Sequence, residues 1–112
     1  MIAKIEYKEG VLGIAKAPLD AAIKISSVVY GWFGQSTLTV TSLRDGKHMT
    51  HSLHERGYAA DLRTFTVDAP QHQALLAAIK GQLGSSYDVV LEEDHIHVEY
   101  DPEHNGGKNL PD

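Results

Sequence analysis

Two segments with helical periodicity, separated and flanked by short segments with period-two patterns, restrict this chain to a fold that contains both helices and strands. Between residues 18 and 33, apolar side chains recur at spacings of three and four, with Pro18 in the first turn and Gly34 directly after the segment. A second helical segment begins at Asp68, the expected N-cap, and ends at Gly84. We therefore predict two helices that each bury one face.

The strand patterns lie around these two helices. They alternate between apolar and polar positions or are rich in β-branched and aromatic residues, as half-buried strands are. The predicted strands are residues 2–7, 37–41, 58–67, 87–91 and 95–100. The first is expected to be a short edge strand. The order strand, helix, strand, strand, helix, strand, strand predicts an α+β fold around an antiparallel sheet.

The size and charge of the chain limit its organisation and its partners. A chain of 112 residues suits one hydrophobic core. We expect a single domain over residues 1–101 and a flexible segment over residues 102–112, where glycine and proline are frequent. The formal net charge is −5, and the basic residues do not cluster, so nucleic acid is not an expected partner.

Some kinds of site and location are excluded by composition. The chain contains no cysteine, so a bound metal would be held by histidine and carboxylate side chains. The first residues lack the basic and apolar regions of a secretory signal, and no stretch reaches the roughly 18 apolar residues of a membrane span. We expect a monomer that is made in the cytoplasm and does not insert into membranes.

The distribution of the histidines indicates a binding or catalytic site. Six of the seven histidines fall within two short regions, residues 48–54 and 95–104. His48 and His51 in the first region suit polar loop positions. The clustering of the others favours a binding or catalytic role over a random distribution.

Two histidines and one aspartate have a spacing that suits a metal site. His54 and Asp61 are separated by Gly57, which permits a sharp turn that brings both side chains to one point. His95 and His97 lie two residues apart and therefore share one face of a strand. Two imidazoles and one carboxylate, with a fourth position left for water, are the ligands of a catalytic zinc site.

Two motifs resemble the signature of the M15 D-Ala-D-Ala metallopeptidases. The motifs are Ser52-x-His54-x-x-Gly57-x-Ala59-x-Asp61 and, downstream, Asp94-x-x-His97. With the elements that join them they span about residues 38–100. The family includes zinc D,D-carboxypeptidases, vancomycin-resistance D,D-dipeptidases and phage L-alanyl-D-glutamate endolysins, and it shares its fold with the hedgehog signalling domain. The resemblance implies that fold, and zinc-dependent hydrolysis of peptide bonds in bacterial peptidoglycan stem peptides.

Position by position, the resemblance implies that His54, Asp61 and His97 bind Zn²⁺. Asp94 occupies the place of the family's general acid and base, which accepts a proton from the attacking water and passes it to the leaving amine. Glu93 is the alternative, because the family uses either acid and the local register could shift by one residue.

Three further residues are assigned roles in the site. Arg44 resembles the family arginine that holds the substrate carboxylate or stabilises the developing oxyanion. His95 would stabilise the tetrahedral intermediate or orient a neighbouring residue. Ser52 would hydrogen-bond to a metal ligand or to the loop backbone.

Other interpretations stay open. The substrate could be free or terminal D-Ala-D-Ala, cut by a dipeptidase or carboxypeptidase activity, instead of cross-linked wall. A non-catalytic relative in a phage particle would use zinc for structure or binding. Residues 92–94 also suit an acidic hairpin turn. Without a secretory signal, delivery to the cell wall by a phage, through a holin or the virion, is the expected route.

Overall fold

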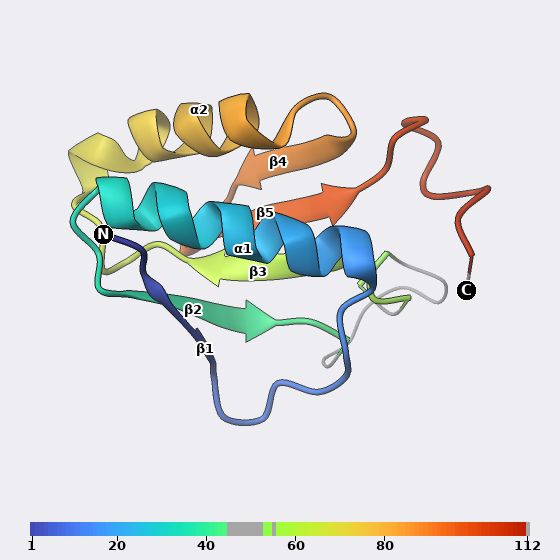
Figure 1. Cartoon of the computed structure of the whole chain (residues 1–112), viewed down its shortest axis with the longest axis horizontal. Helices are drawn as coiled ribbons and strands as arrows, with labels where there is room; N and C mark the ends of the chain where they lie inside the picture. Colours follow the sequence, from blue (N-terminus) through green and yellow to red (C-terminus); the bar gives the residue numbers. More distant parts are fainter. Residues whose placement is uncertain (45–52, 55, 112) are drawn as a thin grey trace.

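The computed structural model describes residues 1–44, 53, 54 and 56–111, which form a five-stranded sheet with two helices packed on one of its faces (Figure 1). The elements along the chain are β1 (Lys4–Tyr7), α1 (Ala17–Trp32), β2 (Thr37–Ser42), β3 (Ala59–Arg63), a short 3-10 helix (Ala69–Gln71), α2 (His72–Leu83), β4 (Tyr87–Leu91) and β5 (His95–Tyr100). The α+β class and the order of elements expected from the sequence are confirmed.

The sheet is mixed, which corrects the expectation of an antiparallel sheet. Its strand order is β1-β2-β3-β5-β4. β1 and β2 pair in parallel, while the other neighbours pair antiparallel. The cause is α1, which lies between β1 and β2 in the chain and forms the crossover that a parallel pair requires. The expectation that β1 is an edge strand is confirmed.

α1 follows the predicted pattern closely. Pro18 lies in its first turn, where the missing N–H costs no intrahelical hydrogen bond. Tyr30 is fully buried, and its hydroxyl donates to the Arg63 carbonyl at 2.8 Å, which satisfies the one polar atom of this side chain. Within the described residues, no helix is long and apolar enough to cross a membrane.

The region between β3 and α2 departs from the expected boundaries. β3 ends at Arg63 instead of continuing to residue 67, because the chain turns there and the Val67 N–H donates to the Thr64 carbonyl at 2.9 Å. The Asp68 side chain makes no capping hydrogen bond. Instead, the backbone carbonyl of Asp68 accepts a hydrogen bond from the backbone N–H of Gln71 at 2.8 Å, in the 3-10 helix that precedes α2. Gly84, with φ of +79°, ends α2 as expected.

The two faces of the sheet differ in character. In the pairing of β3 with β5, Leu62 lies opposite Ile96, and both are buried completely in the core beneath the helices. The next pair along the strands, Asp61 opposite His97, points to the other face because side chains alternate along a strand. The helices therefore cover one face, and the other face presents polar side chains.

The segment after β5 makes specific contacts with the rest of the chain. The Asp101 carboxylate accepts hydrogen bonds from the backbone N–H groups of Asn105, Gly106 and Gly107 at 2.9–3.2 Å. The side chains of Arg56 and Tyr58 donate to carbonyl groups of the same segment. The flexibility expected for residues 102–112 stays a prediction, against which these contacts count.

Candidate metal centre

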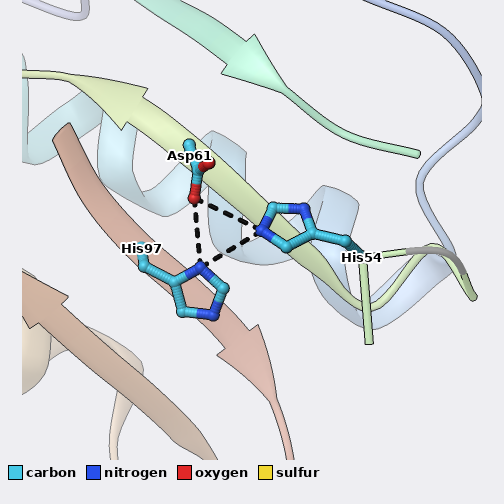
Figure 2. A group of neighbouring side chains, drawn as sticks. All are labelled: His54, Asp61 and His97. Atoms are coloured by element: carbon cyan, nitrogen blue, oxygen red, sulfur yellow. Dashed lines mark hydrogen bonds and ion pairs between the residues drawn. The ribbon is translucent and has the colours of Figure 1, made fainter. Parts of the chain in front are cut away.

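Three side chains from separate parts of the chain converge on the open face of the sheet (Figure 2). They are His54, Asp61 and His97, the residues predicted as ligands, and one ligand atom of each lies within 4.8 Å of the others. Asp61 Oδ1 is 3.0 Å from His97 Nδ1 and 3.4 Å from His54 Nε2. The two histidine nitrogens are 3.2 Å apart. Such a group could hold a metal ion.

Local structure explains how the three side chains meet. Asp61 and His97 are direct partners across the β3–β5 pair, so their side chains leave the sheet side by side. His54 comes from the turn before β3, in which the Gly57 N–H donates to the His54 carbonyl at 3.0 Å. Gly57 has a φ of +85°, and a Cβ there would lie 3.1 Å from the Ile14 carbonyl oxygen. The prediction that Gly57 permits a sharp turn between His54 and Asp61 is therefore confirmed.

Each imidazole is oriented by a hydrogen bond from its second nitrogen. His54 Nδ1 lies 2.8 Å from the Leu43 carbonyl, which can only accept, so Nδ1 carries the hydrogen and Nε2 is left to face Asp61. His97 Nε2 lies 2.7 Å from Glu99 Oε1, so Nε2–H donates to this carboxylate and Nδ1 faces the group. Metal-binding histidines typically donate their other N–H to a carbonyl or carboxylate in this way.

The charged residues of the group shift each other's pKa values. Burial alone would raise the pKa of Asp61, but hydrogen bonds from His54 and His97 and the nearby His95 hold that pKa well below its ordinary value. Burial alone would lower the pKa of His97, yet hydrogen bonds to Asp61 and Glu99 raise it to about 9. The two shifts have one cause: the Asp61 carboxylate and its imidazole neighbours stabilise each other's charged forms, so Asp61 is ionised, as a metal ligand must be.

The donor set limits which metals fit. Two imidazole nitrogens and one carboxylate oxygen match the protein ligands of catalytic zinc sites, which leave a fourth position open. The same donors also bind other divalent first-row ions, so the side chains alone do not select one metal.

The predicted acid and base residues lie beside this group. Asp94 Oδ1 is 2.6 Å from His95 Nδ1, and His95 Nε2 is 3.6 Å from Asp61 Oδ1. The hydrogen bond from His95 lowers the pKa of Asp94, which favours the ionised form that can accept a proton. His95 therefore lies between Asp94 and the candidate ligand Asp61.

A hollow opens next to Asp61. It is lined by Lys8, Thr41, Ser42, Asp61, Arg63, Phe65, Asp94 and His95. Its volume of about 470 Å³ lies within the range of small-ligand sites, roughly 300–1,000 Å³. Asp94 lines the hollow and Glu93 is an exposed residue outside that lining, so the position of Asp94 suits a base better.

The basic residues in the hollow differ from the one expected. Arg44 is exposed and its stem lies against Gly13, outside the residues that line the hollow. Arg63 does line it, with its guanidinium 4.7 Å from the centre of the Phe65 ring. Lys8 is the other basic residue of the lining. The role assigned to Arg44 stays a prediction.

Sequence reasoning missed Glu99 and Arg63. Glu99 lies two residues after His97 and Arg63 two residues after Asp61, so each shares a strand face with a candidate ligand. That spacing was the available signal. Ser52, His48 and His51 lie outside the described residues.

Comparison with known proteins adds no identification. A scan against models of protein families finds no match, and a search among curated proteins finds none.

Proposed function

We propose that the protein is a zinc-dependent peptidase that hydrolyses peptide bonds in the stem peptides of bacterial peptidoglycan. The observation that carries this proposal is the convergence of His54, Asp61 and His97, with both imidazoles oriented by a second hydrogen bond, beside a hollow. The resemblance of the two motifs to the M15 family supplies the substrate class.

Each residue of the site would have a separate role in peptide hydrolysis. His54, Asp61 and His97 would hold the zinc ion. When bound there, zinc would supply Lewis-acid polarisation of a scissile carbonyl and would lower the pKa of water enough to make it a nucleophile near neutral pH. Asp94 would accept the proton of the attacking water and donate it to the leaving amine. The His95 imidazole, 2.6 Å from Asp94, would keep that carboxylate oriented toward the hollow.

The hollow would receive the substrate beside the ligand group. Arg63 and Lys8 would supply positive charge for a substrate carboxylate, the task that the sequence assigns to Arg44. The guanidinium of Arg63 is well suited because its stacking on Phe65 restricts its orientation.

The test combines metal analysis with turnover. Zinc per chain is measured by elemental analysis, and release of amino groups is followed on purified peptidoglycan. We expect one zinc per chain in the wild type, loss of zinc and activity in His54→Ala, and retained zinc with activity lowered about 100-fold or more in Asp94→Asn. Circular dichroism of each variant checks that the fold is intact.

Matched variants separate the neighbouring assignments. Glu93→Gln should keep its activity, and Arg63→Ala should raise KM more than Arg44→Ala does. Zinc without amine release in the wild type would contradict the peptidase and leave a binding or structural role. Turnover of soluble D-Ala-D-Ala, with no release from the wall, would identify a D,D-dipeptidase or carboxypeptidase instead.

A further inference from the structure

The turn that carries His54 is in contact with the C-terminal segment, residues 102–111. The described residues of this turn, called the His54 turn below, are Leu53, His54, Arg56, Gly57 and Tyr58. Two of its backbone hydrogen bonds are internal: Gly57 N–H to the His54 carbonyl and Tyr58 N–H to the Leu53 carbonyl, at 3.0 and 2.8 Å. Further stabilisation comes from other segments.

Three side-chain hydrogen bonds join the His54 turn to the C-terminal segment. Arg56 donates through its two terminal nitrogens to the carbonyls of Gly107 and Leu110, at 2.8 and 2.6 Å. The Tyr58 hydroxyl donates to the Pro111 carbonyl at 2.6 Å. Bonds from a charged guanidinium are among the stronger hydrogen bonds of a protein.

Apolar packing reinforces these bonds. Leu53, Tyr58 and Ala59 form a small core of their own, against which Leu110 and Tyr100 pack. Leu53 is only 8% exposed, and the backbone of Gly107 lies so close that a Cβ there would collide with the Leu53 side chain. The residue directly before His54 is therefore covered by the C-terminal segment.

The C-terminal segment is itself held in shape by Asp101. This residue is 4% exposed, and its carboxylate accepts three backbone N–H groups of residues 105–107. The bonds bend the chain back toward the His54 turn. A shaped segment can support the turn, whereas a loose one could not.

We propose that the C-terminal segment positions His54 for metal binding by holding the residues on both sides of it. The two strand ligands, Asp61 and His97, are fixed by the β3–β5 register, but His54 lies outside the sheet. Small displacements of one ligand weaken a metal site because coordination distances are narrowly defined. This inference rests on the metal centre of the proposed function and adds the segment that completes it.

The test uses two glycines of the same segment. Gly106 and Gly107 both have a positive φ, +76° and +73°, so alanine causes similar backbone strain at either position. A Cβ at Gly106 meets open space, whereas one at Gly107 meets Leu53. Gly107→Ala should therefore displace either the Leu53 side chain or the segment, and either change disturbs their contact at the His54 turn. Gly106→Ala is the matched control.

Two quantities are measured on both variants and the wild type. The first is zinc affinity, from competition with a chromogenic chelator; Gly107→Ala should lower it about 10-fold or more relative to Gly106→Ala. The second is hydrogen exchange of the Gly57 and Tyr58 amides without metal, which should be faster in Gly107→Ala. Melting temperatures of the two variants control for general destabilisation.

The outcomes separate this inference from the proposed function. If the wild type binds no zinc, the proposed metal centre is wrong. Hydrogen exchange of the Gly57 and Tyr58 amides still shows whether the C-terminal segment holds the His54 turn. Equal exchange rates in the two variants overturn the inference. Equal zinc affinities, with faster exchange in Gly107→Ala, also overturn it, because the turn would then be held without effect on His54.

Discussion

His97 contacts a carboxylate through each of its two ring nitrogens. Nδ1 lies 3.0 Å from Asp61, a candidate metal ligand, and Nε2 lies 2.7 Å from Glu99. The second contact selects which nitrogen is free to bind metal and increases the basicity of the ring. Metal affinity would then depend on Glu99, a residue that would not touch the metal.

Replacement of Glu99 should weaken metal binding without removing a ligand. Glu99→Ala takes away the acceptor of His97 Nε2–H, and zinc affinity should fall about 10- to 100-fold. Glu99→Gln keeps an acceptor oxygen but loses the charge, so its loss should be smaller. Chelator competition measures both, and Glu6→Ala on β1 is the control. An affinity of Glu99→Ala equal to that of the wild type would show that the contact has no role.

The candidate ligands are placed by the strand pair β3–β5 and by the His54 turn, which the C-terminal segment contacts. The pair places Asp61 opposite His97, and the segment reaches the turn that bears His54. Asp101 connects these elements, because it directly follows β5 and accepts the N–H groups that shape the segment. Its burial alone would raise its pKa, but the hydrogen bonds from Gly106, Gly107 and Asn105 hold the pKa below its ordinary value.

The Asp101 hydrogen bonds should make stability depend on acid pH. A carboxyl group with a lowered pKa in the folded state stabilises the fold above its ordinary pKa of about 4, and this contribution is lost as pH falls through the folded-state pKa. Asp101→Asn should cost about 1–3 kcal/mol at pH 7 and reduce the acid dependence. Urea unfolding at several pH values measures both. An unchanged acid dependence in the variant would assign it to other groups, such as Asp61.

The two layers of the fold place the core and the candidate metal group on opposite faces of the sheet. Both helices pack on the face that carries residues such as Leu62 and Ile96, and the core lies there. The candidate ligands lie on the opposite face, where no helix of the described residues packs. The candidate ligands are not part of the main core, so we expect that they can be replaced without loss of the fold.

Zinc should stabilise the folded chain through this site. A ligand that binds only the folded state at 100 times its Kd adds about 2.7 kcal/mol, which raises Tm by on the order of 10 °C in a domain of this size. His97→Ala should abolish the shift. Thermal unfolding with and without zinc measures it, and a similar shift in wild type and variant would locate binding elsewhere.

Local patterns in the sequence determined the elements and the candidate ligands. Apolar spacing predicted both helices, and period-two patterns or β-branched and aromatic content predicted the five strands. The motif residues His54, Asp61 and His97 lie together in the structure. These features are readable because each depends on neighbours within a few residues of the chain, or on a spacing that a motif preserves.

The tertiary structure alone decided the features that depend on contacts between distant segments. The parallel pairing of β1 with β2 depends on α1 returning the chain across the sheet so that β2 lies beside β1. The Leu43 carbonyl that orients His54, and the choice of Arg63 over Arg44 in the hollow, depend on how β2 and β3 are placed. The support of the His54 turn by residues 102–111 joins residues about 50 positions apart. No local pattern encodes such contacts, because they form only when hydrophobic burial has fixed the layers.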